Sequence, residues 1–93
     1  MILVWSARAL EGRHAQLDYI AADNFAAANE VDREIERQTK RLIEHPELGR
    51  PGRVAGTREL VIQRTSLIVV YRIRPRGRRI ELLRVLHGAQ RWP

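Results

Sequence analysis

The sequence contains no cysteine, and it contains no apolar run long enough to cross a membrane. Without cysteine there is no disulfide framework, no thiol nucleophile and no thiolate metal site. The apolar stretch at the N-terminus ends at residue 5, which is too short for a signal peptide and far too short for a transmembrane helix. We therefore expect one cytoplasmic domain over residues 1–93, near the lower end of the size range for a single hydrophobic core.

Lysine is nearly absent, and acidic residues are scarce in the second half of the chain. Sixteen of the seventeen basic residues are arginine. Residues 1–48 carry six basic and nine acidic side chains, a net charge of −3, whereas residues 49–93 carry eleven basic and two acidic ones, a net charge of +9. Because a guanidinium group binds phosphate or carboxylate through two parallel hydrogen bonds, this segregation favours an anionic partner. The alternative is a cationic face that is only solvated.

Recognisable motifs for metal, nucleotide or hydrolytic chemistry are also missing. Residues 47–56 contain three glycines and a proline, but they do not form a P-loop or a dinucleotide-binding pattern, and we expect a plain connecting loop there. The three histidines do not have the spacing of metal ligands. We interpret His14 and His45 as structural residues, and we expect neither a metal nor another cofactor.

The chain is organised around residues 58–87, which we predict to be three strands of an antiparallel meander. Branched aliphatic and aromatic residues fill segments 58–63, 67–73 and 80–87. Such residues pack well on a pleated surface, and the β-branched ones lose side-chain freedom in a helix. Both connections are short enough for hairpins, and Pro75 with Gly77 indicates a turn in the second.

The first half of the chain predicts one strand and two helices. Residues 2–5 are all apolar, which is typical of an interior strand buried on both faces. Ser6 and Asn24 are good N-caps for helices over residues 7–22 and 25–44. Apolar residues recur on both at spacings of three and four. The predicted stripes are Leu10, His14, Leu17, Ile20 and Ala21, and then Ala28, Val31, Ile35, Gln38 or Thr39, Leu42 and Ile43.

The predicted element order is β-α-α-β-β-β, which indicates an α+β domain of two layers. We expect a helical hairpin packed on one face of a small, mainly antiparallel four-stranded sheet. The other face, or a groove beside the C-terminal segment, would then be left for function. Strict alternation along the strands places Arg72 with Ile68 and Val70, and Arg84 with Leu82 and Leu86, so we expect at least the aliphatic stems of both arginines to be buried.

The candidate chemical groups all lie in the basic half. His87 ends the last predicted strand, where an imidazole is accessible enough to act as general acid or base. Four arginines are able to stabilise a phosphorane charge, and two aromatic residues are able to stack on bases. The arginines are Arg58, Arg72, Arg84 and Arg91, and the aromatic residues are Tyr71 and Trp92. For Tyr71 in such a strand, core packing is the favoured interpretation, whereas for His87 a hydrogen-bonded strand end and a functional role are equally favoured.

Three segments together resemble the RelE/ParE superfamily of toxins: residues 56–62 (GTRELVI), 69–73 (VVYRI) and 84–93 (RVLHGAQRWP). Residues 5–20 and 45–50 are similar to that superfamily's helical hairpin and its exit loop. The resemblance covers nearly the whole chain and implies the superfamily's β-α-α-β-β-β fold. It also implies the toxic half of a bacterial type II toxin–antitoxin module of the kind that also stabilises plasmids.

The resemblance implies a cognate antitoxin protein as partner, with operator DNA bound mainly through the antitoxin. We expect that antitoxin to fill an apolar groove with a helix or strand, and a strand there would extend a sheet edge. Its binding segment is expected to be acidic, because residues 49–93 carry a net charge of +9.

The molecular target differs between the two branches of the superfamily. RelE-like members cleave mRNA on the ribosome, and they tend to carry an arginine at the position of Ile68 and often a lysine where this chain has Glu59 and Val61. ParE-like members poison DNA gyrase, and the ending at residues 84–87 is more similar to theirs. The resemblance therefore favours gyrase inhibition by Arg84, Arg91, Trp92 and Tyr71 as target-binding residues.

An mRNA interferase remains the alternative, with His87, Arg58 and Arg72 as its catalytic residues. A third possibility, outside the toxins, is a basic module that binds nucleic acid without inhibiting growth.

Overall fold

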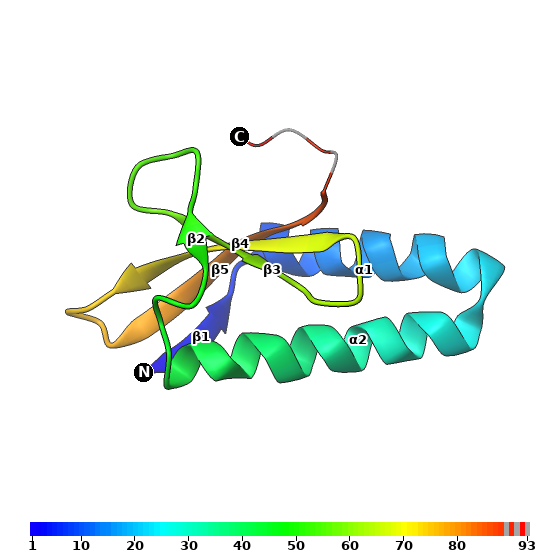
Figure 1. Cartoon of the computed structure of the whole chain (residues 1–93), viewed down its shortest axis with the longest axis horizontal. Coiled ribbons are helices and arrows are strands. Elements are labelled where there is room, and N and C mark those ends of the chain that lie inside the picture. Colours follow the sequence, from blue (N-terminus) through cyan, green and yellow to red (C-terminus); the bar gives the residue numbers. More distant parts are fainter. Residues whose placement is uncertain (89, 91, 93) are drawn as a thin grey trace.

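The structure, a computed structural model, describes residues 1–88, 90 and 92. Two helices pack on one face of a sheet (Figure 1). The elements are β1 (Ile2–Trp5), α1 (Ala7–Asp23), α2 (Phe25–Lys40) with a 3-10 turn (Arg41–Ile43), β2 (Arg50–Pro51), β3 (Arg58–Val61), β4 (Leu67–Arg74) and β5 (Arg79–His87). The predicted α+β architecture is confirmed. No described helix is long and apolar enough to cross a membrane.

The sheet has five strands in the order β1-β5-β4-β3-β2, one more than predicted. The additional strand, β2, is a two-residue segment of the stretch that the sequence indicated to be a plain loop. Only β1 and β5 run parallel; the other neighbours are antiparallel. The prediction of a buried interior strand over residues 2–5 is wrong. β1 lies at the edge, with Ile2 63% and Val4 38% exposed, because only Leu3 and Trp5 point toward the core.

Both predicted helix caps are present. The Ser6 and Asn24 side chains accept hydrogen bonds from the amides of Ala9 and Ala27 at 3.1 and 3.0 Å. These bonds satisfy amides that have no partner inside the helix. Arg13 joins the two helices, because its guanidinium pairs with Asp32 at 2.7 Å and with a second α2 carboxylate.

The stripe predicted for α1 differs from the observed one. Leu10 and His14 are exposed, and Ala9 is the fully buried residue. The reason is a close approach of α1 to β5: a Cβ at Gly12 would lie 2.6 Å from the Val85 carbonyl oxygen. Gly12 therefore makes the closest contact of α1 with β5, and Leu17, which belongs to the predicted stripe, packs against the core.

The stripe predicted for α2 is largely observed. Its buried side chains, with those of the 3-10 turn, are Ala28, Ile35, Gln38, Thr39 and Leu42. Ile43 is 39% exposed, so it does not belong to that stripe.

The sheet has a helix-covered inner face and an outer face. The inner face carries the main core, in which Ile35 and Leu42 meet residues of β3, β4 and β5 and the residue that follows β3. Those residues are Leu60, Ile62, Leu67, Val69, Tyr71, Ile80, Leu82 and Val85. The outer face carries a smaller apolar patch of Ile68, Val70 and Leu86, with Val70 fully buried.

A β-bulge in β5 changes which residues share a face. Val70 pairs with Arg84, but the next residue of β4, Tyr71, pairs with Leu82, so Leu83 is the extra residue. A bulge of this kind interrupts the strict alternation of side chains. Leu82 consequently packs in the inner core, whereas Arg84 lies on the outer face. The expectation that Arg84 shares a face with Leu82 is therefore wrong, whereas its other expected neighbour, Leu86, does lie on the outer face with it.

Candidate functional site

Tyr71 and Arg58 are paired neighbours on the inner face. Tyr71 is fully buried, its hydroxyl donates to the Pro46 carbonyl at 2.7 Å, and it accepts from the Gly49 amide at 2.8 Å. Burial raises the pKa of this phenol above its usual value, although the bond from Gly49 opposes the shift. A side chain in this position cannot stack on a base, which is a correction to the predicted target-binding role of Tyr71.

Arg58 helps Tyr71 hold the same loop. Its Nη1 donates to the Gly49 carbonyl oxygen at 2.7 Å. The amide and the carbonyl of Gly49 are thus both bound by residues of the inner face. A Cβ at Gly49 would lie 2.7 Å from the Tyr71 ring, which explains why a glycine is needed at this contact.

Arg72 lies on the opposite, outer face, where it pairs with Glu81 across the β4–β5 ladder. Glu81 also binds Arg74 and Arg79, and the three N–O distances are 2.5, 3.1 and 3.1 Å. Hydrogen bonds from these guanidiniums, with that of Arg72 the strongest, lower the pKa of Glu81 to about 2. The Arg72 charge is therefore partly balanced within the sheet.

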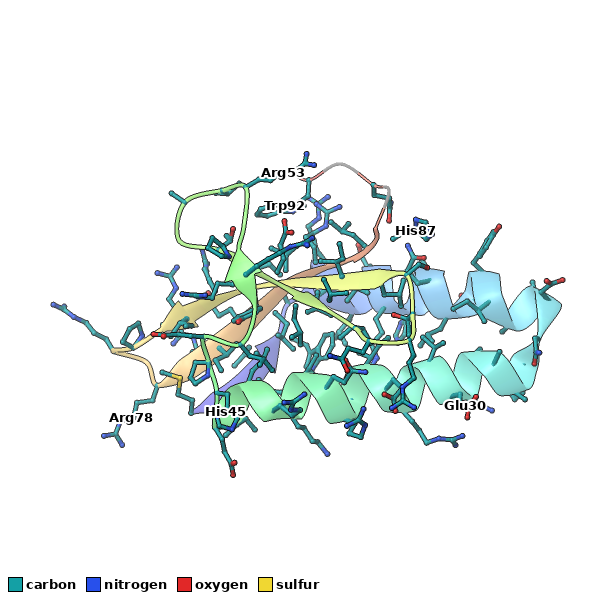
Figure 2. All side chains as sticks on the ribbon, in the orientation of Figure 1. Glu30, His45, Arg53, Arg78, His87 and Trp92 are labelled. Carbon is teal, nitrogen blue, oxygen red and sulfur yellow. The ribbon has the colours of Figure 1, made fainter. Side chains whose placement is uncertain are left out.

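Arg84 lies on the outer face beside Val70 and is half-buried. Trp92 is also half-buried, and Figure 2 shows it on the side of the sheet away from α2. The outer face thus brings together one guanidinium and a buried aliphatic patch, with an indole on the same side. Arg91, the remaining predicted residue, lies outside the described residues.

His87 is the last residue of β5 and is exposed. Its backbone amide donates to the Gln90 side-chain oxygen at 2.6 Å. It pairs with Leu67, whereas Arg58 pairs with Tyr71, four residues further along β4. Four residues of a strand span about 13 Å. The structure therefore separates the three predicted catalytic residues: His87 and Arg58 at different ends of the sheet, and Arg72 on the other face from Arg58.

A groove at the free edge of β3 is a candidate site that the sequence analysis did not identify. β2 pairs only with Arg58 and Glu59, so Leu60 and Val61 have no strand beside them on this edge in the described part of the chain. The groove has a volume of about 380 Å³ and is lined by Gln38, Arg41, Leu48, Gly49, Arg50, Glu59, Leu60, Val61 and Gln63. Pro51 was an available signal, because proline within a sheet is confined to edges and strand ends.

Gln38 closes one end of this groove. It is 3% exposed, accepts from the Gln63 amide at 2.8 Å and donates to the Gln63 carbonyl oxygen at 3.2 Å. The Gln38 side chain thus occupies the backbone amide and carbonyl of Gln63, as a neighbouring strand would just beyond the end of β3. Backbone groups that a partner strand would use thus face the free edge at Val61 and are occupied at Gln63, whereas those of Leu60 face β4.

Comparisons with known proteins identify a family. The family model described as "ParE toxin of type II toxin-antitoxin system, parDE" matches residues 3–92. The protein named "Putative toxin Y4kP" of Sinorhizobium fredii (strain NBRC 101917 / NGR234) is 40% identical over 89 residues, which are 96% of this chain and 90% of that protein.

Two solved structures have the same architecture. A chain of the "Chromosomal ParDE TA system from P. aeruginosa" superposes with a TM-score of 0.82 at 27% identity, covering 94% of this chain and 95% of that one. The isolated E. coli RelE toxin superposes with a TM-score of 0.64 at 13% identity, covering 98% and 86% of the two chains. At this identity the likeness to the second structure shows the fold alone.

Proposed function

The chain belongs to the ParE toxin family of type II toxin–antitoxin systems, and from this premise we propose that it arrests bacterial growth by inhibiting DNA gyrase. In this proposal the protein acts by binding, in the cytoplasm and without a cofactor. A cognate antitoxin neutralises it. The proposal extends the family membership to a target, a binding surface and a partner.

The observation that carries the proposal is the separation of the candidate catalytic residues. Cleavage of RNA by its own 2′-hydroxyl requires an acid or base and a cation within hydrogen-bond reach of the same phosphate. His87 and Arg58 pair with β4 residues four positions apart. Arg72 points to the other face from Arg58 and shares Glu81 with two more arginines. This geometry favours a binding protein over a nuclease.

We assign target binding to the outer face around Arg84 and Trp92. Interfaces usually draw most of their affinity from a few tryptophan, tyrosine and arginine side chains around a desolvated centre. Of the aliphatic residues near Arg84 on this face, Val70 and Leu86 are already buried and Ile68 is half-buried, so Ile68 is the apolar side chain that a partner would contact. Trp92 is the aromatic residue on this side of the sheet (Figure 2).

The groove at the free edge of β3 is the proposed docking site for an antitoxin segment. An extended segment could pair with the edge-facing backbone groups of Val61, which would add a strand to the sheet. Arg41 and Arg50 line the groove with only Glu59 as an acidic side chain. An acidic segment therefore fits the charge of this site.

The test is a supercoiling assay with purified gyrase and the purified chain. We expect inhibition by the wild type, and we expect the double variant Trp92→Ala/Arg84→Gln to need roughly 30-fold more protein, which corresponds to about 2 kcal/mol of lost binding. Arg33→Gln is the matched control, because Arg33 is exposed on α2. Unchanged supercoiling at an excess of wild-type protein would refute the gyrase target.

The nuclease alternative is tested in cells. After induction of the chain without its antitoxin, primer extension on cellular mRNAs should show no new codon-phased 5′ ends. New ends that disappear in the His87→Ala/Arg58→Ala variant would establish an mRNA interferase instead. Growth arrest with a DNA-damage response and no such ends is the result that we expect.

A further inference from the structure

The hairpin that joins β4 to β5 is the most strongly charged element of the described chain. Residues 72–81 contain five arginines and one acidic residue, Glu81, a net charge of +4. Its turn is tight, because the Arg78 amide donates to the Pro75 carbonyl at 3.2 Å and Arg78 adopts a positive φ of 49°. Figure 2 shows the Arg78 side chain directed away from the body of the molecule at the end opposite the α1–α2 connection.

Glu81 binds three of the five guanidiniums through the same kind of nitrogen atom. Arg72, Arg74 and Arg79 each bind this carboxylate through Nε. Nε is the inner nitrogen of the guanidinium, so the two terminal nitrogens of each group remain available for another acceptor. Their side chains are 41%, 48% and 42% exposed, whereas that of Glu81 is only 18% exposed. One shielded carboxylate therefore holds three arginines with their outer donors toward solvent.

The other two arginines of the hairpin add unbalanced charge. Arg76 and Arg78 are exposed and form no ion pair within the described residues. Together with the three guanidiniums gathered at Glu81, they place five cations at one end of the sheet.

The chemistry of the hairpin favours nucleic acid over a protein partner. Its surface hollow is lined by Arg74, Pro75, Arg76, Gly77 and Arg79, with no aromatic or large aliphatic side chain. Protein interfaces need such apolar anchors at their centre. Surfaces that bind DNA are more polar and much more positive.

The absence of aromatic residues from segment 72–81 also distinguishes between forms of nucleic acid. Single strands are bound by stacking of bases on aromatic side chains, in addition to charge. A cluster of guanidiniums without such a platform suits the two closely spaced phosphate backbones of a duplex.

We propose that the β4–β5 hairpin, residues 72–81, binds the phosphate backbone of duplex DNA without reading its sequence. This activity of the toxin chain itself goes beyond the proposed inhibition of gyrase and does not depend on it. In a complex with an enzyme that acts on DNA, the hairpin would hold the toxin on the nucleic acid.

The test measures fluorescence anisotropy of a labelled 20-base-pair duplex of mixed sequence with the purified full chain, between 50 and 200 mM salt. The double variant Arg76→Gln/Arg78→Asn removes the two unpaired cations, and asparagine tolerates the positive φ at position 78. We expect binding at 50 mM salt to weaken about tenfold. The negative slope of log K against log salt should become shallower by about 1.8, which is 0.9 for each lost phosphate contact.

Two further variants separate position from charge and from folding. Arg8→Gln/Arg33→Gln removes the same charge from exposed sites on α1 and α2, and its affinity should change less than about twofold. Arg76→Lys/Arg78→Lys keeps the charge, and its salt slope should match the wild type. Thermal unfolding of each variant shows whether the fold is intact.

Three outcomes would overturn the proposal. The first is equal weakening by the hairpin variant and by the control on the helices, which would indicate only a net-charge effect. The second is tighter binding of a single strand of the same sequence than of the duplex. The third is preferential binding of polyglutamate, which would assign the hairpin to an acidic protein partner. Because the assay contains no gyrase, its failure would leave the proposed gyrase target untouched.

Discussion

Tyr71 and Arg72 are consecutive residues of β4, yet they belong to two different environments. Tyr71 points to the inner face, where helices bury it and two backbone groups of the 46–49 loop satisfy its hydroxyl. Arg72 points to the outer face, where it shares one carboxylate with two other arginines. Polar groups on the inner face are hydrogen-bonded within the chain, whereas the outer face has more guanidinium donors than its carboxylate can bind.

This contrast separates residues that maintain the fold from residues that are available to partners. No buried side-chain nitrogen or oxygen lacks a hydrogen bond in the described part of the chain. Polar residues of the inner face, such as Gln38 and Thr39, are therefore parts of the scaffold. On the outer face, one shielded acid meets several cations, and this surplus is the physical basis for binding an anionic partner.

The largest effect is expected from removing the inner tyrosine. Tyr71→Ala should lower the free energy of unfolding by about 3–5 kcal/mol, because it leaves a cavity and two backbone groups without partners. Tyr71→Phe should cost about 1–3 kcal/mol through the lost hydroxyl alone. Urea denaturation measures both.

Tyr19→Ala is the control for the tyrosine pair, because Tyr19 is 81% exposed and should change stability by less than about 0.5 kcal/mol. Similar losses at both positions would contradict the division between a scaffold face and exposed surface.

An intermediate effect is expected where α1 touches the inner face. Gly12→Ala would raise helix propensity by about 1 kcal/mol, but its Cβ would lie 2.6 Å from the Val85 carbonyl oxygen. We expect net destabilisation of about 1–3 kcal/mol from overpacking.

The exposed α1 residue Ala15 provides the matched comparison. Ala15→Gly should lower the free energy of unfolding by about 0.5–1 kcal/mol. Alanine would thus be the more stabilising residue at position 15, and glycine the more stabilising residue at position 12 of the same helix. If Gly12→Ala instead raised the free energy of unfolding, this result would show that α1 and β5 are free to move apart.

The smallest effect concerns the outer face and depends on pH. The folded-state pKa of Glu81 is about 2, below the usual value of 4.5. A depressed carboxyl pKa contributes stability above the usual pKa, and this contribution is lost as the pH falls toward the folded value. The Tm difference between the wild type and Glu81→Gln should therefore be largest at neutral pH and should shrink between pH 4.5 and about 2.

Glu30→Gln is the control for this measurement, because Glu30 is an exposed α2 residue that forms no ion pair within the described chain. It corrects for the general loss of a negative charge from a basic protein. If the Tm difference for Glu81→Gln were the same at pH 7 and at pH 2.5, the three arginines would contribute nothing to folding through this carboxylate.

Much of the fold follows from local patterns. The caps at Ser6 and Asn24, the helices that follow them and the strands of the meander were all predicted at nearly their observed positions. Each depends on neighbouring residues, through capping geometry or side-chain preference. The charge of the second half was equally visible, because it is a property of composition.

The misplaced residues depend on contacts between distant segments. An all-apolar tetrapeptide looks like an interior strand, but β1 became an edge strand because the sheet ends there. The bulge at Leu83 separates Leu82 from Arg84, and no residue type in that run indicates it. The exposed Leu10 follows from the close approach at Gly12.

The sequence by itself determined the element order, the α+β class, the family resemblance and the segregation of charge, because all of these are written in local composition and periodicity. Only the tertiary structure decided which candidate residues share a surface. It separated His87 from Arg58 and buried Tyr71, and it grouped three guanidiniums on Glu81. The physical reason is that strand register, bulges and sheet edges are set by long-range pairing, which one chain segment does not encode alone.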